Sequence, residues 1–251
     1  MNAGISANRL SISPEIADTR LLKVGGVTPF TATDYPSKLA AVVFVQGCPW
    51  RCDYCHNPHL QLRTPDSPLD WRKVMALLKR RVGLIDAVVF SGGEATVDPA
   101  LQDAIMEVSE LGFQIGLHSA GAYPKRLAEI LPLLDWVGLD IKAPFEHYPR
   151  ITRIPDSGRH ALQSAEAILA SAVDYEFRTT IHPSLLSEDD ILQLAQTLSG
   201  MGVKNYALQL FRAQGCRDVQ LNAVSTVGYP HADLVQRVAA LFPYFTLRQA
   251  E

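Results

Sequence analysis

The chain lacks the features that would place it among membrane, secreted or nucleic-acid-binding proteins. None of its apolar runs approaches the roughly 18–20 residues that a membrane span needs. No apolar block follows a basic start in residues 1–20, so no signal peptide is expected. Its 23 Lys and Arg stand against 26 Asp and Glu, which leaves no basic excess for nucleic acid and no charge run for a membrane surface. We therefore expect a cytoplasmic protein whose partners are neither nucleic acid nor membrane.

Cysteine is also scarce, with 4 residues in a chain of 251. A disulfide scaffold is short and dense in cysteine, and this chain is neither. Cys48, Cys52 and Cys55 lie within one short stretch, whereas Cys216 stands apart. This clustering indicates a metal site in a reducing compartment rather than a set of cross-links.

Expected strands and helices alternate along most of the chain. Apolar residues make up 47% and charged residues 20%, a globular composition. Apolar period and turn residues predict strands at 40–46, 87–91, 114–119, 136–141, 175–182 and 205–211, and helices at 70–82, 99–111, 124–131, 159–172, 188–200 and 232–241. Ser187, with Asp190 three residues later, predicts a capping box at the start of the fifth helix.

Strict alternation of strands and helices predicts an α/β fold with a parallel sheet and right-handed crossovers. Six units fit either an open doubly wound sheet or an incomplete barrel, and we expect an incomplete (β/α)6 TIM-like barrel. Residues 1–20 are expected to form an N-terminal segment, partly disordered, and residues 21–251 a single domain.

Polar or special residues follow every expected strand. Ligands bind at the carboxyl ends of strands in both architectures. In chain order these ends carry Gly47–Cys55, Ser91–Glu94, His118–Gly121, Asp140–Lys142, Arg178–Thr180 and Gln209–Arg212. The sequence therefore predicts one site at the rim where these segments meet.

The spacing Cys48-x3-Cys52-x2-Cys55 is the strongest chemical signal. Three thiolates on one loop can ligate three irons of a 4Fe–4S cluster and leave the fourth iron open for a small molecule. Structural zinc needs four ligands, which His56 and His59 could complete, although no second pair of cysteines exists. Ordinary thiols are the remaining interpretation, and we favour the cluster.

Tyr54 stands directly before the last cysteine of this loop, and Gly92-Gly93-Glu94 follows the second expected strand. Together the two motifs resemble those of the radical S-adenosylmethionine (radical SAM) superfamily. The resemblance implies a barrel of the radical SAM type, a 4Fe–4S cluster held by Cys48, Cys52 and Cys55, and S-adenosylmethionine bound at the open iron.

Two further strings narrow the resemblance. Gln46–Pro58, QGCPWRCDYCHNP, is similar to the glycyl-radical-enzyme activases, and Thr33–Lys38 is similar to the T-x-D-Y-P-G-K lead-in of the activating protein of anaerobic ribonucleoside-triphosphate reductase. The resemblance implies that a 5′-deoxyadenosyl radical removes a glycine Cα hydrogen from a glycyl radical enzyme, here the large subunit of an anaerobic ribonucleotide reductase. It also implies a flavodoxin- or ferredoxin-type electron donor.

The same resemblance implies a set of cofactor-binding residues, namely Tyr54, Gly92, Gly93, Glu94, His118, Asp140, Lys142 and Thr180. Glycines let a ligand approach the backbone closely, although they also serve a strand-to-helix turn, and Glu94 can be structural. Asp140 and Lys142 share one face of a strand end, where an ordinary ion pair is the alternative. For Thr180 the alternative is simple β propensity.

One departure concerns the third strand. The family commonly has Asp-Thr-Asn-Gly there, with a bound monovalent cation in some activases, and this chain has His118-Ser119-Ala120-Gly121. Histidine is largely neutral at pH 7, and a hard cation prefers oxygen ligands, so the change disfavours a bound cation.

Two other functions stay open at this point. One is a radical enzyme that modifies a small molecule or a peptide. The other, from a different class, is an iron–sulfur electron carrier or a zinc-binding module. Cleavage of S-adenosylmethionine by the reconstituted protein separates the second from the rest.

Overall fold

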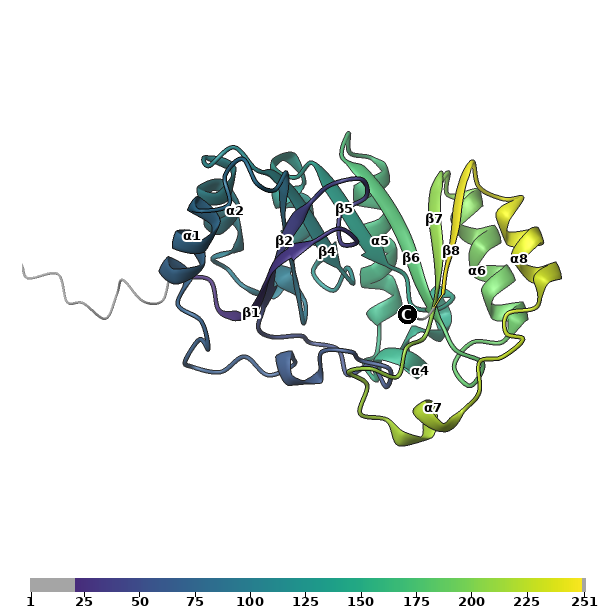
Figure 1. Cartoon of the computed structure of the whole chain (residues 1–251). Coiled ribbons are helices and arrows are strands. Elements are labelled where there is room, and N and C mark those ends of the chain that lie inside the picture. The colour runs from purple at the N-terminus through teal and green to yellow at the C-terminus, as the bar shows by residue number, and fades with distance from the viewer. Residues whose placement is uncertain (1–20, 250–251) are drawn as a thin grey trace, which may run out of the picture.

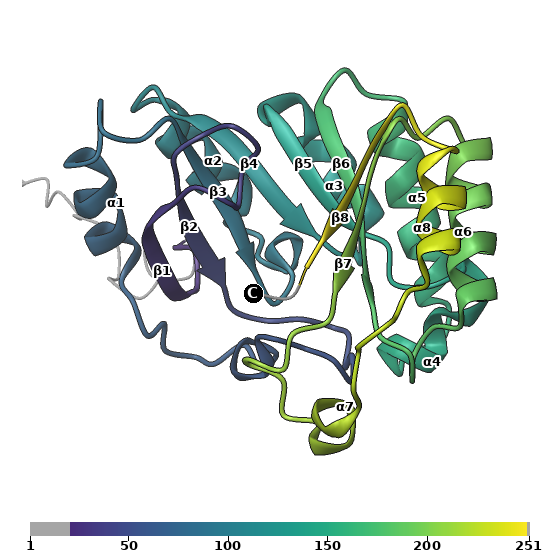
Figure 2. The same ribbon diagram turned by 45° about the vertical axis from the view of Figure 1, so that its right-hand side comes forward.

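A computed structural model describes residues 21–249 of the chain (Figure 1). Within that range eight strands form one sheet in the order β1-β2-β3-β4-β5-β6-β7-β8. The sheet curls into an open barrel with the helices on its outside, and no pairing joins the two edge strands, β1 and β8, among the described residues (Figures 1 and 2). The N-terminal segment expected at 1–20 lies outside the described residues.

The strands are β1 (Val24–Thr31), β2 (Ala40–Val45), β3 (Ala87–Gly92), β4 (Gln114–Ser119), β5 (Trp136–Asp140), β6 (Asp174–Ile181), β7 (Asn205–Leu210) and β8 (Tyr244–Arg248). Strands β2 to β8 run parallel, and β1 is antiparallel to β2. The six predicted strands are β2 to β7, so the expected incomplete barrel is confirmed, with one additional strand at each edge.

The α-helices are α1 (Trp71–Lys79), α2 (Leu101–Ser109), α3 (Pro124–Ile130), α4 (Tyr148–Thr152), α5 (Ser157–Leu169), α6 (Glu188–Gly200), α7 (Val219–Ala223) and α8 (Ala232–Ala239). Short 3₁₀ turns are η3 (Pro58–Leu60), η4 (Ala95–Val97), η5 (Leu131–Leu133) and η6 (Phe145–His147). The predicted capping box at the start of α6 is confirmed. The short helices α4 and α7 were not predicted, and both lie at the end of the barrel where the strands finish (Figure 2). No helix in the described part is long and apolar enough to cross a membrane.

An apolar plug fills the end of the barrel opposite the strands' carboxyl ends. Tyr35 comes from the lead-in before β2 and stacks on Trp136 of β5, with ring centroids 5.2 Å apart. Val42 and Val89 pack against them from β2 and β3. This cluster occupies the amino-terminal part of the parallel strands, and the predicted site lies at their carboxyl ends.

Candidate functional site

The cysteine loop leaves β2 at Gly47, which adopts φ 102°, a conformation that favours glycine. The base of the loop is closed by two backbone hydrogen bonds, from Gly47 N to Leu60 O at 2.7 Å and from Cys48 N to Gln61 O at 3.1 Å. Cys48, Cys52 and Cys55 are half-buried free thiols. The loop is therefore held at its two ends, and its cysteines lie between them.

Helix α4 supports one side of the cysteine loop. Arg51 N donates to the carbonyl of Thr152 at 2.9 Å, and the Trp50 ring packs edge-on against Tyr148 at 5.8 Å. Arg153, directly after α4, forms two hydrogen bonds to the carboxylate of Asp53, at 3.0 and 2.6 Å.

The segment after β7 supports the other side of the loop. The His56 ring nitrogen Nε2 lies 3.0 Å from the carbonyl of Arg212. Cys216 is buried, and its Sγ contacts the carbonyl of Asp53 at 3.6 Å. Cys216 therefore packs behind the loop.

The three thiols fit a cluster better than a single metal ion. Burial raises the pKa of Cys48 to about 12, and burial also raises the pKa of Cys52, so a bound metal must displace the thiol protons. Among residues 21–249, no three His, Cys, Asp or Glu side chains are gathered closely enough to hold one metal ion. In a cubane each thiolate binds a separate iron, so the three cysteines do not have to converge on one ion.

The Gly92-Gly93-Glu94 turn packs directly on the base of the cysteine loop. A Cβ on Gly92, which has φ 127°, would meet the backbone of Val45. A Cβ on Gly93 would meet the carbonyl of Gly47, and Glu94 N donates to that same carbonyl at 2.8 Å. The close approach that requires these glycines is thus made by the protein's own backbone, and the two sequence motifs form one structural unit.

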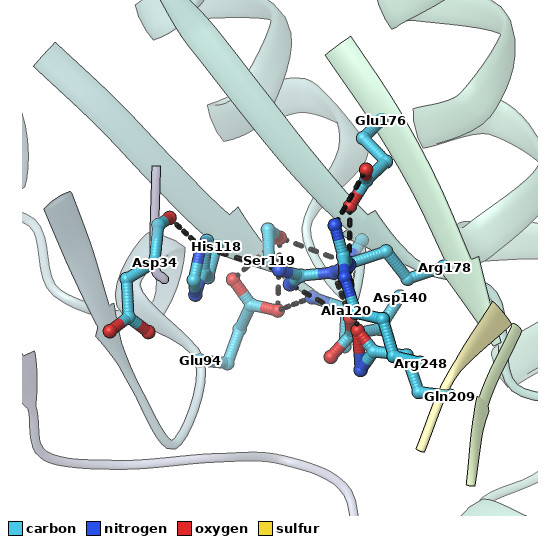
Figure 3. Close-up of polar contacts among 11 residues, drawn as sticks. Asp34, Glu94, His118, Ser119, Ala120, Asp140, Glu176, Arg178, Gln209 and Arg248 are labelled. Carbon is cyan, nitrogen blue, oxygen red and sulfur yellow. Dashed lines mark hydrogen bonds and ion pairs between the residues drawn. The ribbon is translucent and has the colours of Figure 1, made fainter. Parts of the chain in front are cut away.

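Glu94 is only 1% exposed, and protein groups surround its carboxylate (Figure 3). Oε1 accepts from the Thr96 hydroxyl at 2.7 Å and from the Ser119 hydroxyl at 2.9 Å, and Oε2 accepts from Ala120 N at 2.8 Å. Glu94 therefore joins the turn after β3 to the end of β4, which is the structural alternative considered for it.

A chain of polar contacts crosses the barrel interior from β6 to the lead-in (Figure 3). The Arg178 guanidinium forms an ion pair with Asp140 at 2.9 Å and lies 3.3 Å from Nε2 of His118. That nitrogen is 2.7 Å from the carbonyl of Asp34, so it carries the ring proton. Sequence analysis placed Arg178 at the carboxyl end of its strand but did not identify it as the partner of Asp140.

These contacts set the charges of Asp140 and His118. Burial alone would raise the pKa of Asp140, but the neighbouring Arg178 and Lys142 hold it below its ordinary value. Burial, followed by repulsion from Arg178, lowers the pKa of His118 to about 4. Asp140 is therefore ionised and His118 neutral at pH 7.

Lys142 is a buried cation with no carboxylate partner. It is 8% exposed, its ammonium lies 5.3 Å from the ring centroid of Tyr54, and it forms no ion pair with any described residue, since Asp140 pairs with Arg178 instead. Burial would lower its pKa, but Tyr54, Cys52 and Asp140 raise it well above the ordinary value. A buried, charged ammonium beside the cysteine loop fits the carboxylate of a bound amino-acid cofactor such as S-adenosylmethionine.

The last expected residue, Thr180, is half-buried near the end of β6 and pairs with Gln209 of β7. Sequence reasoning missed a second ion pair in the interior, in which Arg248 of β8 binds buried Glu176 through two contacts of 2.7 and 2.9 Å (Figure 3). Glu176 and Arg178 alternate along β6, and this pattern could have indicated that Glu176 points into the interior as Arg178 does. Nothing marked Arg248, because β8 was not predicted.

Known proteins that are similar to this chain agree with this geometry. The sequence profile of the Radical SAM superfamily matches residues 42–198. A protein of Methanocaldococcus jannaschii, itself assigned provisionally as a glycyl-radical enzyme activating enzyme, is 29% identical over 78% of this chain and 82% of its own length. The pyruvate formate-lyase-activating enzyme of Clostridium pasteurianum is 36% identical over 41% of this chain and 46% of that enzyme.

A solved structure gives the same fold. SuiB of Streptococcus suis, crystallised with S-adenosylmethionine, superposes with a TM-score of 0.61 at 12% identity, over 82% of this chain and 48% of SuiB. The profile covers more than half of the chain, including all three cysteines of the loop. The chain belongs to the radical SAM superfamily, whose enzymes use a 4Fe–4S cluster and S-adenosylmethionine.

Proposed function

We propose that this radical SAM enzyme is an activase that installs a radical on a glycine of a partner enzyme. When bound, the cluster and S-adenosylmethionine together supply a 5′-deoxyadenosyl radical, which takes a hydrogen atom from the glycine Cα. The observation that carries the proposal is the loop Gln46–Pro58, seated on the Gly92-Gly93-Glu94 turn by the contacts of Gly93 and Glu94 with Gly47. The relative from M. jannaschii, similar over most of the chain, supports it.

The proposal gives each site residue a task. Cys48, Cys52 and Cys55 hold the cluster. Lys142 binds the cofactor carboxylate, and Tyr54, whose ring centroid is 5.3 Å from the Lys142 ammonium, lines the same part of the site.

The remaining residues position this arrangement. Asp140, paired with Arg178, orders the end of β5 beside Lys142. Thr180, half-buried near the end of β6, is assigned to the adenine of S-adenosylmethionine, as the resemblance implies. Glu94 acts by holding Ser119 and Ala120, and His118 by its contact with the lead-in.

A protein substrate suits the open barrel. The edge strands β1 and β8 are not paired with each other among residues 21–249, so no hydrogen bonds close the barrel on that side, and we propose that a peptide loop enters there. Glycine is a sensible target, because the absence of a side chain permits close approach and the neighbouring amide groups stabilise the Cα radical.

The partner that we favour is the large subunit of an anaerobic ribonucleotide reductase. The support is the resemblance of the lead-in Thr33–Lys38 to that branch of activases. In this structure the lead-in packs inside the barrel, because Tyr35 stacks on Trp136 and the Asp34 carbonyl contacts His118. We further propose a flavodoxin- or ferredoxin-type electron donor and a cytoplasmic location, where the four free thiols stay reduced.

Electron paramagnetic resonance tests the activase function. The reconstituted, reduced protein is incubated anaerobically with S-adenosylmethionine and, in separate samples, with a ribonucleotide reductase large subunit or a pyruvate formate-lyase from the same organism. A doublet from the remaining glycine α-hydrogen is expected on the reductase, and a Cys52→Ala sample should give none. A doublet on the lyase alone would transfer the assignment to that partner, and no doublet on either would end the activase proposal.

Modification of a peptide or small molecule is the alternative, and SuiB, crystallised with its precursor peptide SuiA, has a similar fold. That function predicts cleavage of S-adenosylmethionine and a permanent mass change in a substrate, without a persistent protein radical. Membership of the superfamily sets aside the electron-carrier and zinc-module interpretations.

A further inference from the structure

Four exposed arginines lie on the cysteine loop or on the two segments that contact it. They are Arg51, Arg153, Arg212 and Arg217, and we call them the arginine collar. They come from three segments of the chain that are distant in sequence: the loop itself, the end of α4 and the connection between β7 and α7. Figure 1 shows α4, α7 and the cysteine loop gathered at the same end of the barrel.

Each collar residue belongs to a segment that touches the loop. The Arg51 guanidinium donates to the carbonyls of Cys48 and Trp50, at 2.6 and 2.9 Å. Arg153 pairs with Asp53. The other two arginines come from the segment after β7, through the contact between the Arg212 carbonyl and His56 and the contact between Cys216, next to Arg217, and Asp53.

The collar has more positive charge than its neighbours neutralise. Of its four members, only Arg153 forms an ion pair with a described residue. Asp218, which follows Arg217 in the chain, caps the start of α7 by accepting from Gln220 N at 2.8 Å and Leu221 N at 3.0 Å, and its carboxylate offsets one of the four positive charges. Arg51 bonds only to neutral carbonyls.

This excess is local, because the chain as a whole has a net charge of −3. A positive patch on an acidic protein gives a directional field that attracts an acidic partner to that one face and raises the rate of encounter. The patch is made by the loop that is to hold the cluster and by the segments that contact it.

We propose that the arginine collar is the docking site of a small acidic redox protein, a flavin or iron–sulfur carrier, that delivers the single electron which the reaction consumes. This inference rests on the proposed function. In the transfer the carrier loses one electron and this protein gains one, and no bond is made or broken. The collar suits the carrier rather than the glycine-bearing partner, because the glycine must enter the barrel interior, whereas the carrier needs only the shortest path to the loop from outside.

The test uses a charge reversal at the two collar residues whose side chains form no ion pair and no described hydrogen bond. The double variant Arg212→Glu/Arg217→Glu is compared with Lys79→Glu/Arg80→Glu, which makes the same change of charge on exposed residues at the end of α1. The neutral variant Arg212→Gln/Arg217→Gln covers the case in which the reversal disturbs folding. The probe is a flavodoxin, a small acidic flavin protein.

Three measurements decide the outcome. Flavodoxin binding to the reconstituted protein should weaken about 10-fold or more in the collar reversal at low salt, with a flatter dependence on ionic strength, and should weaken by less in the neutral variant. Electron delivery by reduced flavodoxin should slow in parallel. Reduction by dithionite, a small reductant that needs no docking, should stay unchanged, and the α1 variant should match the wild type throughout.

The collar proposal fails if the reversal binds flavodoxin and accepts its electron as the wild type does. It also fails if the reversal keeps flavodoxin binding but loses activation of the glycine-bearing partner, because the collar would then bind the substrate protein. The proposed function is judged separately, by whether dithionite-reduced wild-type protein forms the radical on a partner.

Discussion

The carboxylate of Glu94 accepts a hydrogen bond of 2.9 Å from the hydroxyl of Ser119, although Glu94 follows β3 and Ser119 is the last residue of β4 (Figure 3). The same carboxylate also accepts from Ala120 N at 2.8 Å. Through Glu94 the turn that supports the cysteine loop is coupled to the end of β4. The acidic member of this family motif thus positions two neighbouring parts of the site in this chain.

We predict that Glu94→Gln destabilises the protein. The amide nitrogen cannot accept from the donors that face it, so buried donors lose their partner, at a cost of about 1–3 kcal/mol in the free energy of unfolding. Urea denaturation measures this loss. Ser119→Ala removes one donor to Glu94 and leaves Gly121 N, which donates to the Ser119 hydroxyl at 2.9 Å, without its acceptor, so it should also cost about 1–3 kcal/mol. Unchanged stability with lost binding of S-adenosylmethionine would instead assign Glu94 to the cofactor itself.

Gly93→Ala should disturb the cysteine loop. The added Cβ would meet the carbonyl of Gly47 and would lie 2.9 Å from that of Leu60, so the loop base has to move. We expect reduced iron content after anaerobic reconstitution, measured per chain. Gly200→Ala is the matched control, because its Cβ meets nothing within 4 Å, and it should bind iron as the wild type does. Full iron content in Gly93→Ala would show that the turn tolerates the displacement.

The buried His118 should make stability depend on pH. In the unfolded chain a histidine takes up its proton near pH 6.5, but in the folded protein burial and Arg178 lower the pKa of His118 to about 4. Between these values the unfolded state binds more protons, so falling pH favours unfolding.

We therefore expect the wild type to lose stability from pH 6.5 down to about 4, and His118→Gln to lose less, with a slope smaller by up to about one proton. The comparison with the variant removes the contribution of the carboxylates that also titrate. Unfolding free energies measured across this range check the difference, and identical slopes would contradict a neutral, buried His118.

The four cysteines should divide into two groups. Alanine at Cys48, Cys52 or Cys55 should abolish the cluster, whereas Cys216→Ala should keep about four irons per chain, because three thiolates suffice for a cubane and Cys216 packs behind the loop against the Asp53 carbonyl. Iron and sulfide analysis with the visible absorption spectrum measures this. Loss of the cluster in Cys216→Ala, with the fold intact by circular dichroism, would make Cys216 a fourth ligand.

The sequence predicted the parts of this fold that depend on local patterns. Strands β2 to β7 are continuous or alternating apolar runs, and each was placed correctly. Strand β1 was missed because Gly25, Gly26 and Pro29 disfavour a strand in isolation, and it forms only by pairing with β2. Strand β8 is short and half-exposed at the edge of the sheet.

The site divides in the same way. The spacing of the three cysteines was enough to indicate a cluster site, since all three ligands lie on one loop. The packing of Gly93 on Gly47, and the bond from Ser119 to Glu94, depend on how distant turns meet, which no local pattern encodes. Arg248 reaches Glu176 only because β8 pairs with β7.

The central claim is that hydrogen moves from a glycine Cα of a partner protein to the 5′-deoxyadenosyl group. The most direct test labels the partner with glycine carrying deuterium at Cα, incubates it with the reduced protein and S-adenosylmethionine, and analyses the 5′-deoxyadenosine by mass spectrometry. The proposed activase predicts that the product gains one deuterium from the labelled partner and none from a partner whose target glycine is replaced by alanine. Cleavage of S-adenosylmethionine that leaves the 5′-deoxyadenosine free of deuterium would contradict the claim.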